Sequence, residues 1–132
     1  MATKKEDEDV VVKTRRLGPW VAGPRLGSGS FGQVYRARRA EVSRDEPPEE
    51  VALKVERISD DNEEDSLLGA EAHLLLAFQD SAHSAAFIDC GTAGGRTRWL
   101  AMERLGPTLD QRRRRVPSRR LSASTGLRCF LE

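Results

Sequence analysis

The sequence has few cysteines, no excess of either charge and no long apolar run, and each shortage excludes a class of protein. Two cysteines, Cys90 and Cys129, are too few for a metal cluster of about four nitrogen or sulfur ligands, so we read them as reduced thiols. The 22 basic and 21 acidic residues leave a net charge of +1, which gives no overall attraction to nucleic acid, lipid or acidic substrates. Three consecutive valines at 10–12 fall far short of the roughly 20 apolar residues of a membrane span. We therefore expect an intracellular protein, cytoplasmic or nuclear, with no membrane partner.

The length of 132 residues fits one modest domain with tails. Residues 1–19 begin with a dense mixture of charges and show little periodicity, which is typical of a flexible, solvated tail. From residue 20 the composition changes, and apolar runs are separated by residues that favour turns. We expect the folded unit to extend to residue 108 and a less regular segment to occupy 109–132.

Five short runs rich in valine, leucine and aromatic residues predict β-strands around 21–26, 33–38, 51–56, 85–90 and 97–102. The connections are short, with prolines in the loop 44–50 and glycines in the turn 91–95, so neighbouring strands should be antiparallel. The segment of about 65–78 has the periodicity of a helix. Residues spaced three or four positions apart would lie on one side of it: Leu67, Leu68, Glu71, Leu74, Leu75 and Phe78. The predicted fold class is α+β, a five-stranded antiparallel sheet with one packed helix.

The string LGSGSFGQVYRA places Gly27, Gly29, Gly32 and Val34 in the pattern GxGxxGxV. Missing side chains allow backbone amides to approach phosphate oxygens closely, so the pattern indicates a phosphate-binding loop. A tight glycine turn in an ordinary hairpin would give the same pattern. The residues after the glycines continue as a strand, which favours a hairpin over a ligand and excludes a dinucleotide-binding helix, and no GK[ST] follows as in a Walker loop.

The strand VALKVE alternates so that Ala52 and Lys54 share one face while Val51, Leu53 and Val55 share the other. Lys54 is either a solvated strand lysine or a compact cation directed at phosphates. In the predicted helix, Glu71 stands within the apolar stripe, and a buried carboxylate requires a cation. We therefore predict that Lys54 and Glu71 form an ion pair; the alternative is that Glu71 lies at the edge of the stripe and reaches water.

A GxGxxGxV hairpin, a VALK strand and a helical glutamate, in this order, resemble the first elements of the protein-kinase signature. The strings MERLGPTLD, FIDCG and LSASTGLR are similar to the casein kinase 1 group, and most of all to its tau-tubulin kinase branch. The resemblance covers about 20–128. It implies that 20–108 form a kinase N-terminal lobe with its hinge, and that 109–132 form an incomplete start of the C-terminal lobe.

The resemblance also implies a serine/threonine kinase that uses ATP with magnesium. Leu26 and Val34 would cover the adenine ring with Ala52 as its roof. Lys54 would meet phosphates with Glu71 as its support, and Met102 would be the gatekeeper. Backbone groups of Glu103 and Leu105 would bond the adenine edge. The glycine hairpin would enclose the nucleotide through Leu26, Gly27, Ser28, Gly29, Ser30, Phe31, Gly32 and Val34.

The sequence contains neither an HRD-type catalytic loop nor a DFG-type metal site. Positioning of the acceptor hydroxyl and neutralisation of phosphate charge by magnesium supply most of the rate in phosphoryl transfer. We therefore expect this polypeptide to bind ATP weakly and to transfer no phosphate, because catalytic residues and magnesium ligands are both missing.

Two other functions fit parts of the sequence. A regulatory fragment that binds protein partners without nucleotide would use apolar residues left uncovered near the end of the chain: Leu121, Leu127, Phe130 and Leu131. The arginines at 112–120 would suit nucleic acid or nuclear import. We prefer to interpret this basic run as a solvated face or, by the family resemblance, as a surface that recognises acidic substrates.

Overall fold

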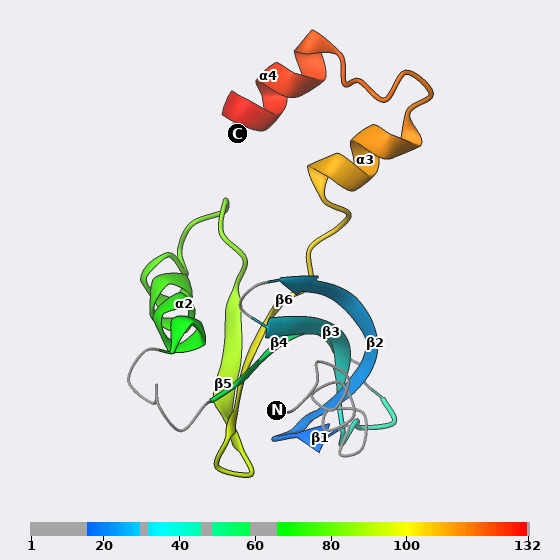
Figure 1. Ribbon diagram of the computed structural model, residues 1–132. Coiled ribbons are helices and arrows are strands. Elements are labelled where there is room, and N and C mark those ends of the chain that lie inside the picture. Colours follow the sequence, from blue (N-terminus) through cyan, green and yellow to red (C-terminus); the bar gives the residue numbers. More distant parts are fainter. Residues whose placement is uncertain (1–15, 30–31, 46–48, 59–65, 132) are drawn as a thin grey trace, which may run out of the picture.

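A computed structural model of the chain describes residues 16–29, 32–45, 49–58 and 66–131. Within these ranges the chain forms one antiparallel sheet and three helices (Figure 1). The strands are β1 (Arg16–Leu17), β2 (Trp20–Gly29), β3 (Gly32–Arg39), β4 (Glu50–Arg57), β5 (Phe87–Ala93) and β6 (Thr97–Glu103). The helices are α2 (Leu67–Ala77), α3 (Leu109–Arg115) and α4 (Ala123–Leu131).

The strands pair in the order β1-β2-β3-β4-β6-β5, and every pair is antiparallel. The predicted α+β class is correct, but the predicted number of five strands is wrong, because the sheet has six. The additional strand, β1, lies in the segment assigned to the flexible tail. Leu17 pairs with Trp20 and is only 3% exposed, so burial of one leucine fixes this short strand at the sheet edge. Residues 1–15 lie outside the described part of the chain.

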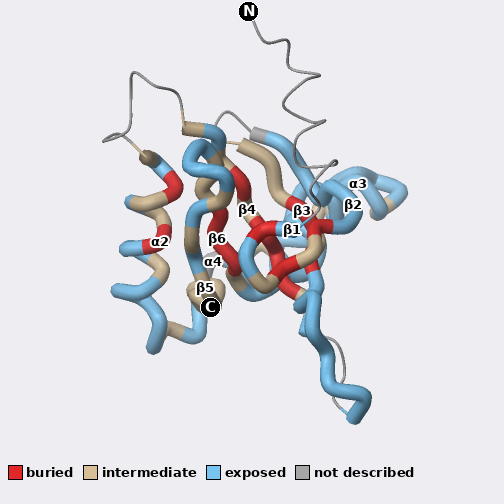
Figure 2. The backbone as a smooth tube through the Cα atoms, turned by 90° about the horizontal axis from the view of Figure 1, so that it is seen from below, coloured by how far each residue is buried: buried red, intermediate tan, exposed pale blue. Residues whose placement is uncertain are grey.

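One face of the sheet carries the larger hydrophobic core. Val51, Leu53 and Val55 point into it from β4, which confirms the predicted alternation along this strand. Figure 2 shows the buried residues concentrated along the central strands. The other members of this core are Leu17, Trp20, Ala22, Tyr35, Ala37, Trp99 and Ala101.

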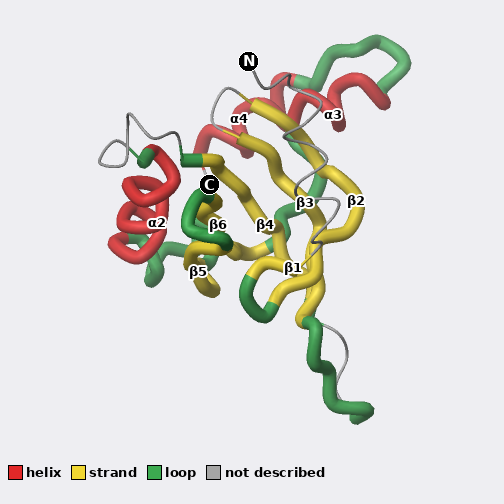
Figure 3. The backbone as a smooth tube through the Cα atoms, turned by 60° about the horizontal axis from the view of Figure 1, so that its bottom comes forward, coloured by secondary structure: helices red, strands yellow, loops and turns green. Residues whose placement is uncertain are grey.

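Helix α2 covers part of the opposite face, beside β5 and β6 (Figures 1 and 3). Its buried residues, Leu68 and Ala72, pack with Leu100 of β6. The predicted apolar stripe is wrong in part, because Leu67, Leu74 and Phe78 are each more than half exposed. The sheet touches only one narrow line of the helix, so apolar residues beside that line remain in solvent. The helix also begins two residues later than predicted, at an N-cap provided by Ser66.

Helices α3 and α4 follow β6 and lie beyond its end, away from the sheet (Figure 1). No residue of α3 is buried. As predicted, Leu127 is largely exposed, whereas Leu121 is half-buried. The side chains of Phe130 and Leu131 lie outside what the structure describes.

Candidate functional site

Antiparallel pairing brings four of the predicted site residues to one face of the sheet. Val34 of β3 pairs with Lys54 of β4, and Ala52, two residues before Lys54, pairs with Met102 of β6. Directly paired residues in an antiparallel sheet project from the same face, and so do residues two apart on one strand. Val34, Ala52, Lys54 and Met102 therefore form one surface, which we call the lysine face. Helix α2 borders it.

The predicted ion pair between β4 and α2 is present. Lys54 Nζ donates to Glu71 Oε2 at 2.5 Å, and the two side chains are 19% and 36% exposed. The expectation that Glu71 faces the core is wrong. Because α2 buries Leu68 and Ala72, Glu71 stands at the margin of the contact, where its carboxylate meets both the lysine and water.

A second polar contact, which we did not predict, fastens α2 to the same strand. Glu56 Oε2 accepts a hydrogen bond from Ser66 Oγ at 2.7 Å and a longer one from the Leu68 amide at 3.4 Å. Ser66 Oγ in turn accepts from the Gly69 amide at 3.0 Å, which caps the helix. Glu56 follows Lys54 by two residues on β4, so the same alternation that selected Lys54 could have identified it.

The glycines of the hairpin have different physical roles. Gly32 has a φ of +126°, and a Cβ there would collide with the carbonyl oxygen of Val55 on β4. A Cβ on Gly27 meets no described atom of a non-neighbouring residue within 4 Å. The sheet therefore requires Gly32, whereas the lack of a side chain at Gly27 leaves open space above the backbone.

The remaining predicted loop residues are only partly described. Leu26 and Ser28 are exposed on β2, and Gly29 ends that strand. Ser30 and Phe31, predicted to help enclose a nucleotide, lie outside the described residues.

The residues predicted to form the hinge are at the end of β6. Met102 is half-buried and packs against the cluster beneath α2. The backbone amide of Glu103 donates to the Ala86 carbonyl at 2.9 Å, and the Glu103 carboxylate accepts from the Ala86 amide at 3.1 Å. This double contact fixes the end of β6 to the segment before β5. Leu105 follows in an irregular stretch, with its side chain 64% exposed.

Glu50 connects three parts of the chain next to this hinge. Its carboxylate accepts from the Arg36 guanidinium of β3 and, at 2.7 Å, from Arg104 Nη1 just after β6. The hydrogen bond from Arg36 is the main cause that lowers the pKa of Glu50, and Arg104 lowers it further. The same contact raises the pKa of Arg36. The sequence placed Glu50 in a loop, but it is the first residue of β4, on the same face as Lys54.

Glu50 should make stability depend on acid pH. Because its pKa is lower in the folded state, its contribution is present above the unfolded-state pKa and is lost as pH falls through the folded-state pKa. We expect Glu50→Gln to reduce the loss of thermal stability between about pH 5 and pH 3, measured by circular dichroism. The matched control is Glu49→Gln, which removes an exposed carboxylate one residue away. Equal pH profiles for wild type and Glu50→Gln would contradict the assignment.

A hollow of about 430 Å³ is lined by Val21, Ala22, Gly23, Pro24, Arg36 and Arg38. Arg36 pairs with Ala52 and so projects from the lysine face, but Lys54, Val34, Ala52 and Met102 do not line this hollow. Across the described ranges, no group of three or more His, Cys, Asp or Glu side chains is arranged to hold a metal ion. The helices of the described part are all too short or too polar to cross a membrane.

No protein-family model matches the chain, and no curated protein matches it either.

Proposed function

We propose that this chain binds ATP on the lysine face, as the N-terminal lobe of a serine/threonine protein kinase similar to the casein kinase 1 group. The observation that carries the proposal is the ion pair between Lys54 and Glu71, on the same face as Val34, Ala52 and Met102. A lysine 19% exposed and held by a carboxylate from another element is directed rather than freely solvated. The motif order in the sequence supports the same family.

Each residue of the lysine face has a chemical part in this proposal. Ala52 and Val34 have small apolar side chains, so the flat adenine ring can pack against them. Lys54 supplies a positive charge for phosphate oxygens, and Glu71 limits the directions in which the ammonium group can point. The open space at Gly27 lets phosphates approach the backbone amides of the hairpin.

Across the described ranges no cluster of three or more His, Cys, Asp or Glu side chains is arranged to hold a metal ion, so the proposal assigns no magnesium ligand to these residues. The sequence likewise lacks HRD and DFG motifs. The proposal is therefore limited to nucleotide binding by these residues, and no transfer step is derived from them.

The decisive experiment is a thermal-shift titration with magnesium ATP on wild type and Gly27→Val. A ligand that binds only the folded state stabilises it by about 2.7 kcal/mol at 100 times its Kd. The melting temperature of the wild type should rise as the ATP concentration is increased. Gly27→Val should melt like wild type without ATP, since a Cβ at this position meets no described non-neighbouring atom within 4 Å, yet should lose most of the ATP-dependent shift.

Gly126→Val is the matched control, because a Cβ on Gly126 in α4 also meets no described non-neighbouring atom and lies outside the proposed site. It should keep the full ATP-dependent shift. A cooperative melt of wild type that ATP does not move would refute nucleotide binding.

That outcome would favour a second function, a protein-interaction module that needs no nucleotide. The observation behind it is the exposure of several apolar side chains on α2 and its C-cap: Leu67, Leu74, Leu76 and Phe78. Exposed apolar surface of this kind marks contact sites in many soluble proteins.

A further inference from the structure

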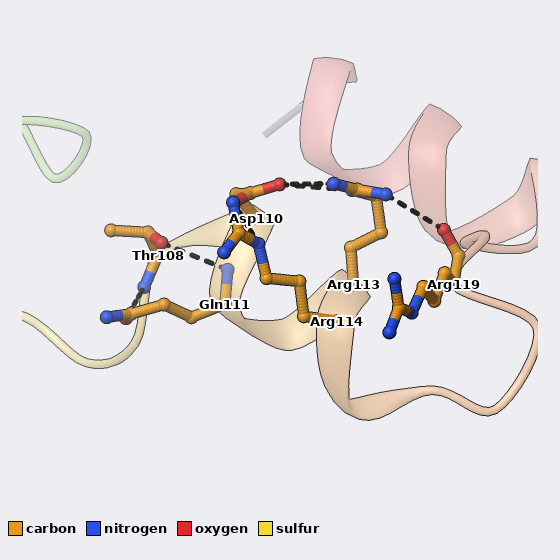
Figure 4. A network of polar contacts seen from close by, with 6 residues as sticks. All are labelled: Thr108, Asp110, Gln111, Arg113, Arg114 and Arg119. Atoms are coloured by element: carbon orange, nitrogen blue, oxygen red, sulfur yellow. Dashed lines mark hydrogen bonds and ion pairs between the residues drawn. The ribbon is translucent and has the colours of Figure 1, made fainter.

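The arginine-rich helix α3 and the loop after it form an ordered polar network (Figure 4). Thr108 caps the helix in a reciprocal arrangement with Gln111. The Gln111 amide donates to Thr108 Oγ1 at 3.1 Å, and the Thr108 amide donates to Gln111 Oε1 at 2.9 Å. This capping box begins the helix directly before four consecutive arginines.

Asp110 forms ion pairs with two of these arginines. Arg113 Nη2 and Arg114 Nε lie 2.6 and 2.8 Å from its carboxylate oxygens. The hydrogen bond from Arg113 is the main cause that lowers the pKa of Asp110. Arg113 also donates to the backbone carbonyl of Arg119 at 3.2 Å and so holds the following loop against the helix. Arg119 itself adopts the left-handed conformation, with φ of +52°.

The other arginines of the segment remain available. Arg112 and Arg115 are three residues apart on α3 and therefore project from the same side of the helix. Arg119 and Arg120 follow on the loop. Within the described part of the chain, none of these four exposed side chains makes an ion pair. Between 109 and 120 the sequence has six arginines and a single acid, so a local excess of positive charge exists in a nearly neutral chain.

We propose that Arg112, Arg115, Arg119 and Arg120 bind the phosphate backbone of double-stranded nucleic acid without reading its sequence. A duplex presents about one phosphate charge for every 1.7 Å of its axis. Several arginines spread over a helix and a loop can therefore contact several phosphates at the same time. A phosphopeptide offers only one or two phosphates to such a spread. This inference is independent of nucleotide binding at the lysine face.

The composition of the segment decides between backbone and base contacts. Residues 104–129 contain no aromatic side chain, so this segment offers no aromatic platform for the bases of a single strand. The Gln111 amide group, the side chain best suited to an adenine edge, is engaged in the capping box. Phosphate contacts by arginine require neither an aromatic platform nor a free amide side chain.

The test is fluorescence anisotropy of the full chain with a labelled DNA duplex, between about 50 and 200 mM salt. Four phosphate contacts predict a slope of log affinity against log salt near −3.6, at about −0.9 per contact. Arg112→Gln with Arg115→Gln should reduce the slope to about −1.8 and weaken binding at least tenfold at low salt. Both side chains are exposed and make no ion pair with another described residue, so circular dichroism should show an unchanged fold.

The matched control is Arg38→Gln with Arg44→Gln, which removes the same charge from exposed positions on β3 and the loop after it. The control should bind within about twofold of wild type. Equal losses in both double variants would show an effect of net charge and overturn the site. A phosphoserine peptide or vesicles of anionic lipid that displaced the duplex at lower phosphate concentration would overturn the choice of partner.

Discussion

Gly32→Ala should lower the free energy of unfolding by about 3 kcal/mol or more, a large share of the total stability of a small domain. The new Cβ would overlap the Val55 carbonyl oxygen, which belongs to the neighbouring strand β4 and cannot move without breaking the sheet. The φ of +126° at Gly32 is a conformation that alanine rarely adopts. Steric overlap and backbone strain therefore add at one position.

Gly27→Ala is the matched control from the same hairpin. Its Cβ meets open space among the described residues, so stability should change by less than about 0.5 kcal/mol. Urea unfolding followed by tryptophan fluorescence measures both variants, because Trp20 and Trp99 are 0% and 5% exposed in the folded core. Similar midpoints for wild type and Gly32→Ala would show that the strands β3 and β4 do not approach as closely as described.

This contrast shows what the glycine pattern could and could not predict. The spacing GxGxxG predicted a hairpin, and β2 and β3 do pair around it. From this spacing every glycine was predicted to serve the same role, a close approach of the backbone to phosphate. Whether a glycine serves a ligand or a neighbouring strand depends on what lies across from it, and β4 reaches that position only after an intervening loop.

Most of the sheet could be predicted because its strands alternate and are separated by turn residues. Strand β1 could not, because two residues next to a charged segment carry no period. The helix was predicted at nearly the right place, but its apolar residues surround more of its circumference than the sheet covers. Leu74 fits the spacing as well as Leu75, yet only Leu75 packs against the core.

The candidate-site residues could be predicted where the alternation of side chains along a strand determines which face they occupy. Lys54 and Glu71 could be paired from their positions on one strand and one helix. The contact of Glu50 with Arg104 could not, because the two residues are 54 positions apart and nothing in either local pattern refers to the other. Tertiary contacts of this kind decide how the end of β6 is held, and they appear only when the sheet is assembled.

Lys54→Met should weaken binding of magnesium ATP at least tenfold, a loss of about 1.4 kcal/mol in binding free energy. Lys54 pairs with Glu71 of α2, so methionine removes the charge that would meet phosphate while keeping most of the side-chain volume. Stability without nucleotide should fall by less than about 1 kcal/mol, because Glu71 is 36% exposed and its freed carboxylate can turn to water.

Glu71→Gln distinguishes a role of the ion pair in ATP binding from a role in holding α2 on the sheet. It keeps the Lys54 cation and removes only its carboxylate partner, so it should weaken ATP binding less than Lys54→Met, as measured by isothermal titration calorimetry on both purified variants. If the ion pair serves only to hold α2 on the sheet, the two variants should lose similar stability and bind ATP as wild type does. A selective loss of binding in Lys54→Met, with Glu71→Gln between it and wild type, is the result that nucleotide recognition by the lysine face requires.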